Sequence, residues 1–211
     1  ISPTMTKLTE AAKFSEDSKA MLEVTITYLE MHRKPINISK NYHGKQVSVT
    51  HVNKPTLSFY RYLYFHIGEP WRWYERRILG DDDLRSIIND AGVSIYVLYF
   101  DGSPAGYFEL DARIDHQVEL AYLGLFPEFI GRGLGSLLLD RALVAAWKSQ
   151  PSRVWVHTCT LDHPNALPCY RNSGFKIHRE ETISIRDPQL EPYWNTALKL
   201  DKNYMDFDTL A

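Results

Sequence analysis

Alternating apolar and polar positions predict strands in several parts of the chain. Residues 22–31 (LEVTITYLEM) and 46–52 (QVSVTHV) alternate well enough to be strands. Residues 93–110 predict two strands joined at Asp101-Gly102, since Asp-Gly is a strong signal for a hairpin turn. Further strands are expected at Val118 to Phe126, at 153–161 and at 176–185.

Helical periodicity and helix-ending residues predict the helices between these strands. Residues 55–90 should hold three short helices, because prolines and the run Asp81–Asp83 stand where helices begin, and Gly68 and Gly80 where they end. A longer helix with an apolar face should follow residues 131–135, and a shorter one should lie before the last strand. This order of elements predicts a mixed α/β sheet with a single clear crossover connection.

The composition is that of an ordinary globular protein, and it excludes some classes of function. Over 211 residues the formal net charge is −2, which argues against a nucleic-acid binder, since such proteins normally carry a basic surplus. We find no apolar run of signal-peptide or membrane-span length, so no membrane partner is expected. Cys159 and Cys169 are too few for a disulfide framework, which favours a cytoplasmic location. The sequence leaves open whether the protein is a monomer or a homodimer.

Three glycines, Gly131, Gly133 and Gly135, stand between the predicted strand 118–126 and the helix that follows. Free N–H groups at a helix N-terminus can hold a phosphate, and glycines let such a ligand approach the backbone closely. Arg132 adds a cation at the same place. The alternative is close packing of the helix on the strand, with no ligand. Two nucleotide motifs are excluded, because no Lys-Ser/Thr pair follows the last glycine and the spacing is GxGxG rather than GxGxxG.

The motif GRGLG (131–135), followed one strand later by ALPCYRNSGF (166–175), resembles the GNAT superfamily of acetyl-CoA-dependent N-acetyltransferases. The resemblance covers about residues 95–185. In the family, the motif Gln/Arg-x-x-Gly-x-Gly/Ala binds the pyrophosphate of coenzyme A through backbone N–H groups. Its two glycines fall on Gly133 and Gly135.

The chain departs from the family pattern at two positions and matches a second signature in full. Ile130 stands at the first motif position, where Gln or Arg is usual. His163 stands where an Asn often contacts pantetheine. The second signature is matched by Ala166, Tyr170, Gly174 and Phe175.

The resemblance implies a mixed, mostly antiparallel central sheet with helices on both faces. It implies one N-acetyltransferase domain over residues 21–185, with N-terminal strands and acceptor-side helices in 21–92 and the acetyl-CoA-binding core in 93–185. Residues 1–20 are expected to be a flexible N-terminus, and residues 186–211 a C-terminal tail.

The resemblance also implies acetyl-CoA as cosubstrate and no metal. In the family, the strand before the glycine loop splays from its neighbour, and its N–H groups meet pantetheine and the thioester carbonyl. That role falls on the backbone of Leu123, Gly124 and Leu125, and Gly124 suggests a β-bulge there. The other expected cofactor contacts are Ile130, Gly131, Arg132, Gly133, Leu134, Gly135, Ser136 and His163.

Glu119 and Tyr170 are the candidates for proton transfer. Glu119 is the only charged residue of the strand 118–126, and a carboxylate partly withdrawn from water is a better base. Its spacing to the glycine loop resembles that of the general-base glutamate in the histone-acetylating branch of the family. The alternative is a strand-end Glu that points into solvent. Tyr170 matches the tyrosine that the family places beside the coenzyme sulfur as a general acid, although it could simply pack the helix against the sheet.

The segment 60–77 (YRYLYFHIGEPWRWYERR) corresponds to the loop that lines the acceptor site in the family. Its aromatic rings and carboxylates favour an organic cation, with Tyr64, Trp71 and Trp73 as substrate contacts. The alternative is that these rings fill the core. The chain is therefore expected to be an N-acetyltransferase acting on a small cationic amine or on a peptide or protein amine. The competing interpretation is a catalytically silent acyl-CoA-binding or sensing module.

The segment HTCTLDH (157–163) raises two further interpretations, a metal site and a cysteine nucleophile. Strand alternation places His157 and Cys159 on one face. No zinc-binding spacing is met, however, and Cys159 lies within a predicted strand rather than at a helix start. Both interpretations are disfavoured.

Overall fold

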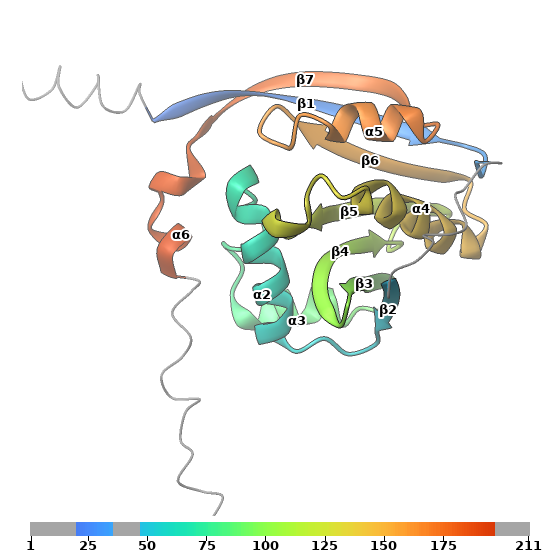
Figure 1. Ribbon diagram of the computed structural model, residues 1–211. Helices are drawn as coiled ribbons and strands as arrows, with labels where there is room; N and C mark the ends of the chain where they lie inside the picture. The colour runs from blue at the N-terminus through green and yellow to red at the C-terminus, as the bar shows by residue number, and fades with distance from the viewer. Residues whose placement is uncertain (1–19, 36–46, 197–211) are drawn as a thin grey trace, which may run out of the picture.

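The computed structural model describes residues 20–35 and 47–196, and a seven-stranded sheet forms its centre (Figure 1). The strand order is β2-β3-β4-β5-β6-β1-β7, and every pair of neighbours is antiparallel except β5 and β6. This confirms the expected mixed, mostly antiparallel sheet. The strands are β1 (Met21–Met31), β2 (Val47–Val52), β3 (Val93–Phe100), β4 (Ser103–Asp111), β5 (Gln117–Leu125), β6 (Arg153–Cys159) and β7 (Lys176–Arg186).

Helices and short 3-10 turns connect these strands. No helix over the described residues has both the length and the apolar character that crossing a membrane requires. The expected flexible N-terminus (1–20) lies outside the described residues except for Ala20, as does the expected tail beyond residue 196. The helices are α2 (Leu57–Gly68), α3 (Asp81–Ile88), α4 (Leu134–Ala146), α5 (Ala166–Asn172) and α6 (Pro192–Thr196), and the 3-10 turns are η1 (Glu69–Trp71), η2 (Pro127–Phe129), η3 (Trp147–Ser149) and η4 (Pro188–Leu190).

The region expected to hold three helices contains two α-helices, α2 and α3, and the single turn η1. Thr56 caps α2, its side-chain oxygen accepting the N–H of Phe59 at 3.3 Å. The middle element stays short because Arg72, which follows η1, adopts a left-handed conformation with φ 56°. The acidic run Asp81–Asp83 forms the first turn of α3 as expected, since carboxylates are stabilised by the positive end of the helix dipole.

The hairpin predicted at Asp101-Gly102 joins β3 to β4. Both residues have positive φ, 48° for Asp101 and 82° for Gly102, as a two-residue type I′ hairpin turn requires. The strong local signal was therefore sufficient to place this connection.

Hydrophobic residues cover both faces of the sheet, which confirms the expected arrangement of helices. On one face, α4 and α5 pack on a cluster that includes Phe108 of β4. On the other, α2 and α3 pack on a cluster that includes Tyr107, the neighbour of Phe108 in the strand. Successive strand residues point to opposite faces, so one strand contributes to both clusters.

β1, the first strand of the described residues, does not lie at the edge of the sheet. β1 lies between β6 and β7, with Ile26 opposite Cys159 on one side and Val24 opposite Ile183 on the other. β7 thereby becomes an edge strand, and most of its residues are exposed. Such long-range pairing depends on tertiary contacts, and the local pattern of the sequence did not predict it.

The segment after β7 packs against the loop that follows η1. The Arg72 side chain forms an ion pair with Asp187, with Nε 3.0 Å from Oδ1. The Arg77 guanidinium lies 3.9 Å from the ring centroid of Trp194 and 4.5 Å from that of Phe65. It also donates to the backbone carbonyl of Trp194 at 3.2 Å. Residues 187–194 therefore stabilise the loop after η1, which forms one wall of the cavity between β5 and β6.

Candidate functional site

The parallel strands β5 and β6 separate soon after they begin. They pair from Gln117↔Arg153 to Glu119↔Trp155, whereas β5 continues to Leu125 and β6 to Cys159. The opening between them contains a cavity of about 350 Å³. Its walls are formed by residues 120–125 of β5, the glycine loop, the start of α5, the end of β6, the loop 71–75, and apolar residues of β1 and β7.

The glycine loop opens into this cavity at the N-terminus of α4. Gly131 and Gly133 have φ of 80° and 77°, in the left-handed region, and a Cβ built on either would meet nothing within 4 Å. Gly133 is the N-cap of α4, and no side chain caps the helix there. Because the first N–H groups of an α-helix have no acceptor within the helix, this end of α4 suits an anion.

The other residues expected to contact the cofactor are placed in different ways. Ile130 and His163 line the cavity, and Nδ1 of His163 accepts the N–H of Asn165 at 3.0 Å. Leu134 is fully buried in the core beneath α4, so only its backbone is available. The Arg132 guanidinium lies 5.3 Å from the ring centroid of Phe129, and Arg132 is not among the cavity-lining residues.

Gly124 does not mark a β-bulge, contrary to the interpretation of the sequence. The register of β4 and β5 shifts between Glu109↔Tyr122 and Leu110↔Leu120, so the extra residue is Ala121. Gly124 is required by packing instead, since a Cβ there would collide with the Ile67 side chain. Leu123, Gly124 and Leu125 all line the cavity.

Tyr170 lies on α5 with its ring buried and lines the cavity. It makes an edge-on contact with Phe175, at 5.9 Å between ring centroids, so it also packs the helix as the alternative interpretation expects. Burial, together with the charge of Asp162, raises the pKa of Tyr170 above its ordinary value. The hydroxyl therefore stays protonated at neutral pH, as that of an unperturbed tyrosine also would, and burial makes it a weaker acid.

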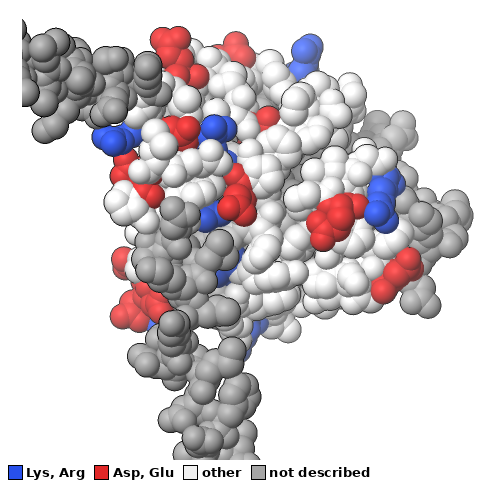
Figure 2. Space-filling view, turned by 60° about the vertical axis from the view of Figure 1, so that its left-hand side comes forward, with Lys and Arg blue, Asp and Glu red and all other residues white. Residues whose placement is uncertain are grey.

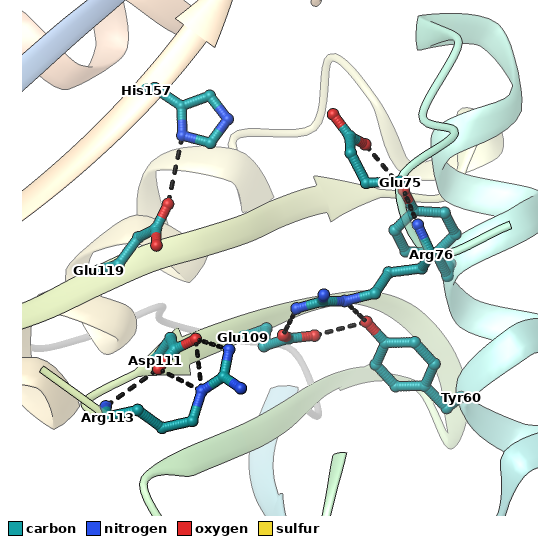
Figure 3. A network of polar contacts seen from close by, with 9 residues as sticks. Tyr60, Glu75, Arg76, Glu109, Asp111, Arg113, Glu119 and His157 are labelled. Atoms are coloured by element: carbon teal, nitrogen blue, oxygen red, sulfur yellow. Dashed lines mark hydrogen bonds and ion pairs between the residues drawn. The ribbon is translucent and has the colours of Figure 1, made fainter. Parts of the chain in front are cut away.

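Glu119 faces His157 across the point where β5 and β6 separate (Figure 3). Oε1 of Glu119 lies 3.2 Å from Nδ1 of His157, and this contact raises the pKa of the imidazole. His157 lines the cavity, whereas Glu119 is not among the lining residues. The sequence placed His157 on a face with Cys159 but contained no signal for its pairing with Glu119, which depends on the register of β5 and β6.

Cys159 also lines the cavity, at the end of β6. Burial raises its pKa to about 11, so the thiolate is disfavoured. Within residues 20–35 and 47–196, no cluster of His, Cys, Asp and Glu is arranged to hold a metal ion.

The acceptor-side aromatic residues divide into cavity and core. Trp71 lines the cavity and lies edge-on to His163, at 5.1 Å between ring centroids. Trp73 lines it as well, and its indole N–H donates to Oδ1 of Asp162 at 3.3 Å. Tyr64 is fully buried and does not line the cavity, so the core-filling alternative describes it. Its hydroxyl donates to Oε2 of Glu75, a cavity-lining carboxylate, at 3.1 Å.

A buried ion pair between Arg76 and Glu109 stabilises the loop 71–75, which forms the acceptor side of the cavity (Figure 3). Glu109 of β4 is fully buried, and it accepts Nη2–H of Arg76 at 2.7 Å and the hydroxyl of Tyr60 at 2.5 Å. The backbone N–H of Arg76 donates to the hydroxyl of Tyr64 at 3.2 Å. These contacts fix the loop that carries Glu75. The members of this network lie far apart in the chain, so no local sequence pattern indicates it.

Comparison with known proteins agrees with this geometry. The model of the acetyltransferase (GNAT) family matches residues 57–175. An uncharacterised N-acetyltransferase from Mycobacterium tuberculosis (strain H37Rv) is 30% identical over 98 residues, which are 46% of this chain and 62% of the relative. An uncharacterised N-acetyltransferase from Mycobacterium bovis matches over the same shares. The chain thus spans less than two thirds of the length of these relatives.

Solved structures share the fold at low sequence identity. A GCN5-related N-acetyltransferase from Kribbella flavida has a TM-score of 0.56 and 17% identity, over 84% of this chain and 65% of its own. A functionally unknown conserved protein from Staphylococcus epidermidis has a TM-score of 0.55 and 14% identity, over 84% of this chain and 67% of its own. An aminoglycoside acetyltransferase from an uncultured soil sample, in complex with sisomicin, has a TM-score of 0.51 and 13% identity, over 61% of this chain and 87% of its own.

The family model covers more than half of the chain, and it includes both the glycine loop and the Tyr170 signature. The separated strands, the glycine loop and the tyrosine all border one cavity. The chain therefore belongs to the acetyltransferase (GNAT) family, whose members are acyltransferases that use acetyl-CoA.

Proposed function

We propose that the protein transfers the acetyl group of acetyl-CoA to a primary amine by direct attack of the amine on the thioester. The observation that carries this proposal is that three features of the site border the same cavity. The N-terminus of α4, the free edge of β5 and the side chain of Tyr170 all border it.

The residues present fit this cosubstrate. The positive-φ glycines leave open space where side chains would stand, and the start of α4 supplies N–H donors for the pyrophosphate. The backbone of 123–125 would meet the pantetheine arm and the thioester carbonyl. Acetyl-CoA supplies an activated acetyl group, and the chain supplies orientation, hydrogen bonds and proton transfer. Tyr170 lines the cavity with its hydroxyl protonated at neutral pH, and it would give its proton to the leaving thiolate.

The acceptor side of the cavity favours a cationic amine. Glu75 and Asp162 supply carboxylates, and Trp71 supplies an aromatic face. Acidic and basic side chains are interspersed around a broad uncharged area on the face shown in Figure 2. Such a surface fits a small amine or a peptide better than a polyanion. The structural neighbour in complex with sisomicin supports an amine of this kind.

A thiol-release screen tests the proposal. Acetyl-CoA is offered together with polyamines, amino acids, aminoglycosides and peptides with a free N-terminus, and we expect amine-dependent release of the thiol. Binding of coenzyme A without release on any amine would instead support an acyl-CoA-binding or sensing module. Failure to bind coenzyme A in a titration would exclude both.

Replacing Gly133 with valine is expected to weaken coenzyme A binding at least about tenfold, equal to about 1.4 kcal/mol. A side chain there meets a left-handed φ and fills space beside the N–H donors. The measurement is a calorimetric titration with coenzyme A. Gly102→Val is the matched control, because Gly102 also has positive φ and open space but does not line the cavity. A folded Gly133→Val protein with wild-type affinity would refute the phosphate-binding role of the loop.

Replacing Trp71 with alanine is expected to raise the KM for the amine several-fold while the affinity for coenzyme A is kept. One cation–π contact contributes about 0.5–2 kcal/mol, so the change is modest. Steady-state kinetics and a coenzyme A titration measure the two effects. Trp73 is a poorer probe, because its ring packs against Gly68 and Gly124 and its loss would disturb the core. Parallel loss of amine and coenzyme A binding in Trp71→Ala would show that this ring is structural.

A further inference from the structure

The structure places an imidazole, rather than a carboxylate, at the cavity wall where β5 and β6 separate. His157 lines the cavity, and Glu119 contacts Nδ1 of His157 from β5. We propose that His157 is the base that accepts the proton of the acceptor ammonium, and that Glu119 is a positioning residue that acts through it. This inference rests on the proposed acetyl transfer and assigns a role within the same site.

The sheet holds the His157–Glu119 pair in place. Glu119 lies opposite Trp155 in the last parallel pair of β5 and β6, and His157 follows two residues later on the same side of β6. On the other side of β6, Tyr28 of β1 is the register partner of His157, and their ring centroids are 5.9 Å apart. Trp155 lies 6.3 Å from the imidazole on the strand itself. Two rings and one carboxylate thus limit the rotation of the imidazole.

The charges around His157 favour its protonated form and a cationic ligand. Glu119 of β5 contacts it at 3.2 Å, and the cavity-lining carboxylates Glu75 and Asp162 also raise its pKa. On the side of β1, Tyr28 contacts the imidazole, and the β7 residues Arg179 and His178 contact the ring of Tyr28. The nearest charged contact of His157 is therefore Glu119. An acceptor ammonium in this cavity would therefore meet the carboxylates of Glu75 and Asp162 near His157.

The contact of Nδ1 with Glu119 determines which nitrogen can act as a base. A carboxylate partner selects the tautomer with the proton on Nδ1, so Nε2 has the free lone pair. Figure 3 shows the second ring nitrogen pointing away from Glu119. Nε2 can therefore take a proton from a ligand in the cavity, while Glu119 stabilises the imidazolium that forms.

The proton balance of the reaction then assigns each group a role. The acceptor ammonium gives one proton to Nε2 of His157, and the amine nitrogen forms a bond to the acetyl carbonyl carbon. The carbon–sulfur bond breaks, and its electron pair leaves with the thiolate, which takes a proton from Tyr170. The second proton lost by the amine nitrogen restores Tyr170, and His157 returns its proton to water. Unbound alkyl ammonium groups have a pKa near 10.4, so a base is needed at neutral pH.

The experiment compares His157→Gln with Glu119→Gln, and His178→Gln serves as the matched control. His178 is an exposed histidine of β7 that contacts Tyr28 but does not line the cavity. For each protein we would measure kcat against pH at a saturating amine found in the screen, and the affinity for coenzyme A. NMR titration of the imidazole protons measures the pKa of His157 without turnover. The His157 signal is identified by its absence from the His157→Gln spectrum.

We expect His157→Gln to lower kcat by roughly 10²–10⁴ near neutral pH, with coenzyme A affinity unchanged. The base acts when deprotonated, so the wild-type kcat rises with pH through the His157 pKa. Glu119 raises that pKa, which places the rise above the ordinary histidine value of about 6.5. Glu119→Gln should move both the NMR pKa and the kinetic rise to lower pH. His178→Gln should match the wild type.

Two outcomes would overturn the inference while acetyl transfer itself stands. One is a His157→Gln protein that keeps the wild-type kcat and pH profile. The other is a larger loss in Glu119→Gln than in His157→Gln, which would make the carboxylate the base. A wild-type protein that releases no thiol with any amine overturns the proposed function, and the role of His157 with it.

Discussion

Replacing Arg76 with methionine is expected to lower the free energy of unfolding by about 3–5 kcal/mol. Glu109 is fully buried, and Arg76 is its cationic partner at 2.7 Å. Methionine keeps much of the volume but leaves a buried carboxylate without a compensating charge. Urea denaturation followed by circular dichroism measures the change.

Two further variants show whether the unpaired charge is the cause. Arg85→Met removes an exposed arginine whose partner Asp82 is also exposed, and it should change stability by less than about 1 kcal/mol. Adding Glu109→Gln to Arg76→Met removes the buried charge and should restore part of the loss. If Arg76→Met is no less stable than Arg85→Met, the buried pair does not support the acceptor wall.

Replacing Tyr170 with phenylalanine is expected to lower kcat roughly 10²-fold while stability and coenzyme A affinity stay near the wild type. The change removes the hydroxyl and keeps the ring that contacts Phe175. The effect is limited because a thiol with a pKa near 8.5, by analogy with cysteine, is a tolerable leaving group without an acid. Thiol-release kinetics under saturating conditions give kcat.

Tyr62→Phe provides the matched control, since Tyr62 is exposed on α2 and does not line the cavity. Its kcat should be unchanged. Tyr170 would instead be a packing residue if its substitution reduced stability or coenzyme A affinity and left turnover per folded molecule intact. The proton donor would then have to be another group.

Local features of the chain were predictable from the sequence because their causes are local. The alternation in 22–31, the Asp101-Gly102 turn and the glycines before α4 each impose a backbone conformation on their own neighbours. The resemblance to the family then predicted how these strands and helices are arranged in the fold. The candidate cofactor residues that line the cavity all lie within residues 95–185, the segment that the resemblance covers.

Features that depend on strand register could not be predicted in this way. The pairing of Glu119 with His157 requires the parallel alignment of β5 and β6, which no single segment encodes. Gly124 looked like a bulge residue, but only the position of Ile67 shows why glycine is needed there. The roles of Tyr64 and Trp71 depend on which ring turns toward the core.

The position of β1 constrains the order in which the sheet can assemble. Thr25 and Thr27 of β1 bond to residues 135 and 153 positions later in the chain, Thr160 and Glu180. Closing such long loops loses chain entropy before any contact compensates for it, so this half of the sheet is expected to form after the β3–β4 hairpin. β7 pairs with β1, so it gains its place in the sheet only once β1 has docked on β6. Until β1 docks, the edges of β6 and β1 that pair in the final sheet are exposed. At this stage folding competes with aggregation.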